Sequence, residues 1–210
     1  QADIAQLSLK TVKTTVGSNL VANDSLRSFN TAAAFMGGNY WYDPAVDKLR
    51  GEPVQARPGF APDDAHPWIG NPKDPARHER AKKVRQAMAF AIDRKTANDA
   101  ILGGLGRVAY IPGIPLDSAD WDNKWNVPFD PDRAKALLKE AGYPNGFEFN
   151  FWIPSDFPNV DVELSQAVAA MWENIGLRPK IVLLAYTAGR PGLLEKKQNV
   201  FDDFIAVAEY

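Results

Sequence analysis

Apolar residues recur with helical spacing between residues 79 and 106. Five of them fall at positions i, i+3, i+4, i+7 and i+8, which is one stripe of an α-helix: Val84, Ala87, Met88, Ala91 and Ile92. Basic residues occupy the start and the flanks of the same stretch. The pattern predicts a buried helix over residues 81–94.

A second helical run is predicted over residues 94–102, with Asp93 as its N-cap. Gly103 and Gly104 should end it, because glycine readily adopts the left-handed conformation at a helix C-terminus. The GGLG run of residues 103–106 could also suggest a phosphate loop. A dinucleotide fingerprint, however, follows a strand and opens a helix, whereas this run closes one.

The next helix is predicted from its termini and its apolar stripe. Asp130 is its N-cap, Pro131 suits the first turn, and Gly142 ends it. The stripe consists of Ala134, Leu137, Leu138 and Ala141. The loop before this helix, over residues 107–126, is rich in aromatic residues.

The last third of the chain has the pattern of a strand–helix–strand unit. Phenylalanines alternate with polar residues over 147–153, which predicts a half-buried strand. A helix over 161–175 and a strand over 180–186 follow, and the two strands should be parallel. The expected inner face of the helix consists of Leu164, Val168, Met171 and Ile175. A short helix near 191–198 and a strand over 201–208 complete the pattern.

The first third of the chain has weaker periodicity. It predicts a short helix over 3–16 and strands over 20–22 and 28–36. Residues 37–76 contain seven prolines, which disfavour a regular helix or a central strand. An aromatic cluster argues against disorder there: Tyr40, Trp41, Tyr42, Phe60 and Trp68.

Composition narrows the possible classes of protein. A chain of 210 residues is expected to form one domain or at most two small ones. The net charge of −2 offers no electrostatic case for nucleic acid, and no run of about 18 apolar residues predicts a membrane span. The absence of cysteine excludes a disulfide framework, cysteine-bound zinc and thiol catalysis. Because the sequence starts at Gln1, without Met or a signal peptide, we expect a mature product or a piece of something longer.

No group of residues predicts catalysis, a metal site or a cofactor. His66 and His78 are the only imidazoles, and we expect both to be solvated, since a nickel or zinc site needs more His or Cys ligands. The paired aspartates at 63–64 and 202–203 have no partner fixed by a motif. No Ser-His-Asp arrangement has a recognisable local context.

Several segments together resemble one known family. The residues KKVRQAMAFAIDRK, followed by ILGGLGRVAYIPGIP, are similar to the signature region of the family 5 extracellular solute-binding proteins, the peptide- and nickel-binding receptors of ABC importers. Three further segments resemble that family: FDPDRAKALLKEAGYPNG, MWENIGLRPKI and FDDFIAVAEY. The resemblance covers residues 83–210 well and 1–36 loosely, and it does not cover the proline-rich insert at about 37–76.

The resemblance implies an α/β fold, a mixed sheet with flanking helices that forms one lobe of a type II-like periplasmic binding protein. Residues 1–210 would be a single, incomplete second lobe, and the first lobe would be missing. The implied function is capture of a peptide or peptide-like solute between two lobes and its delivery to ABC permease subunits, without catalysis. The implied location is periplasmic or extracellular, with the full-length protein anchored as a lipoprotein. The alternatives are a receptor for nickel complexes, sugars or opines, and an interaction or structural module that lost transport.

Aromatic residues in loops and at strand ends are the candidate ligand contacts. Such side chains offer apolar area with a polar tip, which suits a small-molecule or peptide pocket. Tyr110 is the first candidate, because its loop lines the inter-lobe cleft in the resembling family. An acidic residue after the last strand often holds the ligand's amino group in that family, and Glu209 lies near that position. The expected ligand-binding residues are Tyr110, Ile111, Trp41, Tyr42, Trp121, Glu209 and Tyr210. The alternative is that the aromatic residues pack within the lobe itself.

Overall fold

The structure is a computed structural model of the 210-residue chain. It describes residues 31–36, 65–71, 74–104, 106–111, 114, 116, 119–156, 162–194 and 203–208. The predicted helix over 3–16 and the strand over 20–22 lie outside these residues. The strands predicted at 28–36 and 201–208 are described from Thr31 and from Asp203.

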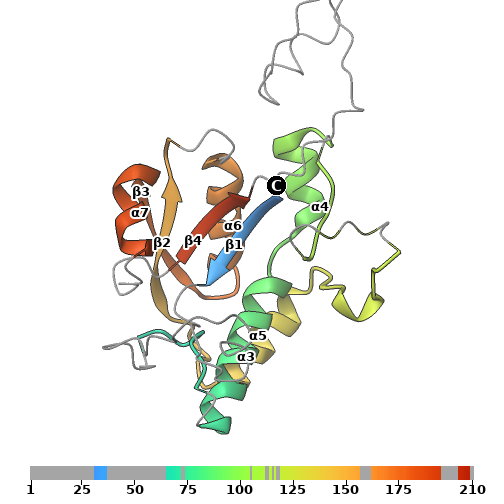
Figure 1. Cartoon of the computed structure of the whole chain (residues 1–210). Coiled ribbons are helices and arrows are strands. Elements are labelled where there is room, and N and C mark those ends of the chain that lie inside the picture. Colours follow the sequence, from blue (N-terminus) through green and yellow to red (C-terminus); the bar gives the residue numbers. More distant parts are fainter. Residues whose placement is uncertain are drawn as a thin grey trace, which may run out of the picture.

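A four-stranded mixed sheet forms the centre of the described structure (Figure 1). Its strands are β1 (Thr31–Met36), β2 (Glu148–Pro154), β3 (Arg178–Leu184) and β4 (Asp203–Ala208), in the order β1-β4-β2-β3. β2 is parallel to both β3 and β4, whereas β1 is antiparallel to β4. The predicted parallel pairing across the strand–helix–strand unit is therefore confirmed.

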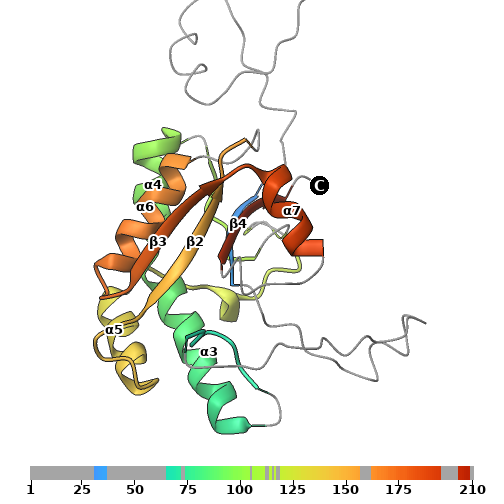
Figure 2. The same ribbon diagram turned by 90° about the vertical axis from the view of Figure 1, so that its left-hand side faces the viewer.

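Helices cover both faces of the sheet, as predicted. α6 (Val162–Glu173) lies on one face and α7 (Tyr186–Leu194) on the other (Figure 2). α3 (Pro75–Phe90) and α5 (Pro131–Glu140) lie side by side in both views, joined by an ion pair of 2.8 Å between Lys83 and Glu140.

The first described helix begins earlier than predicted. α3 spans Pro75–Phe90, not 81–94, because the Asp74 side chain accepts a hydrogen bond of 3.1 Å from the backbone N–H of Arg77. Pro75 follows this N-cap at a position where its missing N–H costs nothing. The irregular region predicted to reach residue 76 is therefore shorter than expected, since a proline there opens the helix.

Aromatic side chains pack against one another in the core between α3, α6 and β2. Phe149 and Phe151 both lie against Trp172, with ring centroids 5.6 and 5.0 Å apart. The indole Nε1 of Trp172 donates to the Met88 carbonyl over 2.9 Å, so its one polar atom is satisfied inside the core. Trp68, expected among loop aromatics, is fully buried and packs on Phe149, so Trp68 and its neighbour Ile69 belong to the core.

β2 is covered on both faces toward its end, so its prediction as a half-buried strand was wrong there. Trp152 is buried although it alternates with Phe151, because α7 covers the face on which it lies. Its ring stacks on Tyr186 with ring planes 10° apart, and a Cβ on Gly189 would come within 2.4 Å of it. The close approach of α7 therefore depends on a glycine.

The inner face of α6 matches the predicted one only in part: Val168 and Ile175, the latter in the turn after the helix, are buried as predicted. Leu164 and Met171 are only half-buried. The helix itself ends at Glu173. Its buried residues are Ser165, Val168, Ala169 and Trp172. The large indole outweighs the aliphatic stripe, because it fills the core and reaches Met88.

α7 also starts before its predicted position. The strand predicted through residue 186 ends at Leu184, and the helix begins at Tyr186. The carboxylate of Asp156, which follows β2, accepts from the backbone N–H of Tyr186. Pro191, the predicted helix start, lies within the helix, and residues 195–198 lie outside the described part.

Candidate functional site

The candidate site is built around the corner between α3 and α4 (Arg94–Ala97). Asp93 caps α4 as predicted, accepting from the backbone N–H and the hydroxyl of Thr96 over 2.9 and 2.7 Å. These hydrogen bonds stabilise the carboxylate and lower the pKa of Asp93. The helical run ends at Leu102 as predicted, but residues Asn98–Leu102 form a π-helical turn.

The exit from this turn is a glycine-dependent reversal. Gly103 and Gly104 have φ angles of 67° and 76°, the left-handed region expected for a helix end. Asn98 stabilises this reversal with two hydrogen bonds. Its backbone carbonyl accepts from Gly104 N over 3.0 Å, and its side-chain Oδ1 accepts from Gly106 N over 2.8 Å. The interpretation of this run as a helix end is confirmed.

Three aromatic side chains lie in sequence on the chain that leads to α5, and we call them the aromatic row: Tyr110, Trp121 and Trp125. The centroids of Tyr110 and Trp121 are 6.0 Å apart, and those of Trp121 and Trp125 are 5.6 Å apart. Trp121 also donates from Nε1 to the Asn126 side chain over 3.2 Å. All three members are half-buried, so each keeps part of its surface exposed.

Arg94 lies at the inner end of the aromatic row. Its guanidinium carbon is 5.2 Å from the centroid of the Tyr110 ring. Its Nη1 donates to the carbonyls of Ala89, Ile92 and Val127 over 3.2, 3.3 and 3.4 Å. Burial lowers the pKa of Arg94 from its usual value, yet an arginine remains charged at neutral pH.

The structure brings together two of the predicted ligand-binding residues, Tyr110 and Trp121. Ile111, beside Tyr110, is half-buried and forms an isolated bridge with Ile114. The remaining four predicted residues lie outside the described part of the chain: Trp41, Tyr42, Glu209 and Tyr210. Sequence reasoning did not assign a role to Arg94, although a basic residue directly after a helix corner can reach the carbonyls that end the helix.

Neither histidine is simply solvated, so that expectation was wrong. His66 is half-buried and lies edge-on to Trp68 at 5.5 Å. The Nδ1 atom of His78 is buried, and a Cβ on Gly70 would approach it to 2.6 Å. Among the residues that the structure describes, no three His, Cys, Asp or Glu side chains gather in a way that could hold a metal ion.

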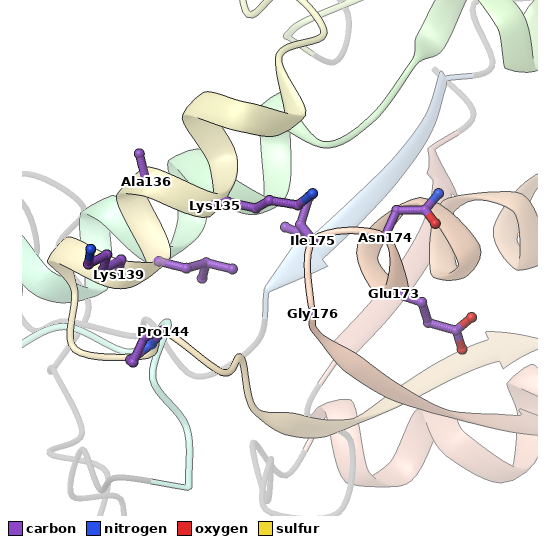
Figure 3. A pocket seen from close by; sticks show the side chains of 9 residues that line it. Lys135, Ala136, Lys139, Pro144, Glu173, Asn174, Ile175 and Gly176 are labelled. Atoms are coloured by element: carbon purple, nitrogen blue, oxygen red, sulfur yellow. The ribbon is translucent and has the colours of Figure 1, made fainter.

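An open hollow of about 520 Å³ lies between the second half of α5 and the turn after α6 (Figure 3). Lys139 and Glu173 stand on its opposite sides, and Ile175 lies between them. Its lysines are exposed. It lies at the other end of α5 from the aromatic row, and its surface does not enclose a ligand. Within the described ranges, no helix has the length and apolar character needed to cross a membrane.

The family described as bacterial extracellular solute-binding proteins, family 5 Middle, matches residues 22–204 of the chain. Heme-binding protein A of Haemophilus influenzae is 40% identical over 100 residues, which cover 46% of this chain and 18% of that protein. Di/tripeptide-binding protein 3 of Pseudomonas aeruginosa is 35% identical over 104 residues, which cover 48% of this chain and 19% of that protein. The matched part of this chain thus spans about a fifth of the length of these relatives.

Among solved structures, the fold is similar to that of an ABC transporter-associated periplasmic binding protein, DppA from Helicobacter pylori, in complex with the peptide STSA. The TM-score is 0.50 at 24% sequence identity, and the match covers 63% of this chain and 25% of the other. The predicted α/β fold of a periplasmic binding protein lobe is therefore confirmed. Sequence identity this low bears on the fold and not on the ligand.

Proposed function

Because this chain belongs to the bacterial extracellular solute-binding proteins of family 5, we propose that it forms part of the substrate-binding component of an ABC importer. The receptor captures a peptide or peptide-like solute between two lobes and delivers it to the permease subunits. Residues 1–210 contribute to one lobe, and the opposite wall comes from the first lobe of the same receptor. The observation that carries this proposal is the family match over residues 22–204.

The ligand-facing wall of this lobe contains Tyr110, Ile111 and Trp121, with Trp41, Tyr42, Glu209 and Tyr210 as further contacts. The aromatic row supports this assignment, because it presents ring faces and polar tips that remain partly exposed. Aromatic side chains of this kind bury a large ligand surface while a few polar atoms set its orientation. The side chain of Glu209 supplies the negative charge for the ligand's amino group.

Transport follows from a hinge motion between the two lobes. A ligand that contacts both walls binds the closed state more tightly than the open one, and this difference shifts the population toward closure. The receptor acts on the periplasmic or extracellular side of the membrane, anchored as a lipoprotein in its full-length form. It is a transport receptor rather than an enzyme.

The identity of the solute is a separate question. A second candidate is haem, since the relative that is 40% identical carries the name Heme-binding protein A. Nickel complexes, sugars and opines are further candidates, and a module that retains the lobe without transport is the alternative from another class. A lipoprotein signal and permease genes beside the full coding sequence would support transport over that module.

The test is mass spectrometry of whatever co-purifies with the complete receptor, followed by calorimetry with a mixed di- to pentapeptide library, with haem as a separate arm. We expect Tyr110→Ala to raise the dissociation constant for the bound solute about tenfold, which is about 1.4 kcal/mol. Val182→Ala is the matched control, because Val182 is 39% exposed on the edge strand β3. A complete receptor that binds neither peptides nor any co-purifying solute would contradict the proposal.

A further inference from the structure

We propose that Arg94 is a positioning residue of the ligand wall. Its guanidinium contacts the Tyr110 ring and fixes the position of that ring. Its effect on ligand affinity rests on the proposed function, whereas its effect on the position of Tyr110 does not. The inference starts from the way in which Arg94 itself is held.

The guanidinium of Arg94 is anchored independently of the aromatic row. Nη1 donates to the carbonyls of Ala89, in the last turn of α3, and of Ile92, just beyond it, where the helix dipole favours a cation. The same nitrogen donates to Val127 on the chain that enters α5. One charged group thus binds to two segments of backbone that are more than thirty residues apart in sequence.

These two segments form a firm junction. The backbone N–H of Asp130, the N-cap of α5, donates to the carbonyl of Phe90 at the end of α3 over 2.9 Å. Arg133, an exposed residue of α5, places its guanidinium 4.7 Å from the centroid of the Phe90 ring, a contact of the same kind that does not involve Arg94 or the aromatic row. The position of Arg94 is therefore set at the junction of α3 and α5, on backbone that is distant from Tyr110 in sequence.

The aromatic row is connected to this junction through the Tyr110 ring. No carboxylate forms an ion pair with Arg94 among the described residues, so the charge faces the ring without a competing anion. A cation over an aromatic face is attracted to the ring, and the attraction is stronger in a partly desolvated site than in water. Trp121 also packs against the Tyr110 ring, with centroids 6.0 Å apart. A ring with two packing partners loses less freedom when a ligand arrives, which lowers the cost of binding.

The first test leaves Arg94 unchanged and reads the contact by NMR. In the 210-residue chain, the δ protons of Arg94 should be shifted upfield by the ring current of Tyr110. We expect Tyr110→Phe to retain this shift and Tyr110→Leu to abolish it. A wild-type chain in which these protons resonate at their ordinary position, or a shift that survives Tyr110→Leu, would overturn the proposal.

The second test changes Arg94 and observes the ring of Tyr110. Arg94→Lys keeps a charge but loses the planar guanidinium whose Nη1 reaches three carbonyls, and Arg94→Met loses both the charge and the guanidinium. We expect the Tyr110 ring signals to move toward those of free tyrosine in both variants, further in Arg94→Met. The matched control is Arg133→Met, which removes a similar cation–ring contact over Phe90 and should leave the Tyr110 signals unchanged. If the Arg94 variants fail to fold, the comparison of Tyr110→Phe with Tyr110→Leu still tests the contact between Arg94 and the Tyr110 ring.

The last measurement separates this inference from the proposed function. In the complete receptor, Arg94→Lys should raise the dissociation constant for the solute about fivefold to tenfold. Arg133→Met should not change it. Displaced ring signals with unchanged affinity would support the positioning role of Arg94 and contradict the ligand role of Tyr110. Unchanged ring signals in a folded Arg94→Met variant would refute the positioning role whatever the affinity.

Discussion

At the scale of single residues, the corner between α3 and α4 shows how two neighbouring charges take different tasks. Asp93 satisfies N–H groups at the start of α4, whereas Arg94 turns back to carbonyls at the end of α3. Each charge therefore lies at the helix terminus that its sign favours. The capping role of Asp93 could be predicted from the sequence, since it depends on residues three positions away. The role of Arg94 could not, because Val127 and Tyr110 reach it only through the fold.

The cap at Asp93 gives a prediction about pH. Because hydrogen bonds from Thr96 lower the folded-state pKa of Asp93, its contribution to stability is present above the unfolded value of about 4 and is lost as the pH falls through the folded value. Wild type should therefore lose more stability than Asp93→Asn between about pH 4 and pH 2. Chemical denaturation at a series of pH values measures this, and parallel curves for the two proteins would contradict it.

A second residue-scale prediction concerns the inner face of α3. Met88 is fully buried, so Met88→Asp places a carboxylate in the aromatic core and should cost at least about 4 kcal/mol, enough to unfold the chain. Met88→Leu preserves volume and apolar character and should cost less than about 1.5 kcal/mol. Thermal melts of both variants provide the comparison. A melting temperature of Met88→Asp near that of wild type would refute the assignment of this face.

At the scale of elements, the sequence pattern predicted the type and order of the helices and strands better than it predicted which of their faces are buried. The stripes of α3 and α5 follow helical spacing, and their buried residues include Val84, Met88 and Leu138 as expected. The predicted face of α6 was right at Val168 and wrong at Leu164 and Met171. The indole of Trp172, which donates to a carbonyl of α3, fills the core in their place. The burial of Trp152 depends on α7, an element that comes later in the chain and crosses over it.

The start of β2 supplies a prediction with its own control. Gly146 has a φ of 64°, and a Cβ there would lie 1.9 Å from the carbonyl oxygen of Gly176, so Gly146→Ala should cost about 3 kcal/mol or more. Gly142 has a φ of 93°, but a Cβ there would meet no atom within 4 Å, so Gly142→Ala should cost only about 1 kcal/mol. Equilibrium unfolding in urea measures both costs. Equal costs would show that backbone conformation, and not the contact with Gly176, determines the effect.

At the scale of the whole molecule, the binding proposal depends on two walls. A cleft that buries most of a small ligand needs both, while the entropic cost of association is incurred in full by either wall alone. Losing about 4 kcal/mol of contacts raises a dissociation constant about a thousandfold. The resemblance in sequence pointed to this architecture, but the four predicted ligand residues outside the described part could not be placed by periodicity.

We therefore predict that the 210-residue chain folds but binds no peptide detectably, whereas the complete receptor does. Calorimetry of both proteins with the same di- to pentapeptide library is the test. Micromolar or tighter binding by the isolated chain would show that it holds a self-contained pocket.

The order of strands in the sheet also has a consequence for synthesis on the ribosome. β4 lies between β1 and β2, yet it comes last of the four strands in the sequence, and its partner β1 ends more than 160 residues earlier. The pair of β2 and β3 can form as soon as β3 emerges, but the two halves of the sheet cannot join until β4 has left the exit tunnel. During that interval β1 lacks the strand with which it pairs in the folded sheet, and an unpaired strand edge is prone to pair with another chain.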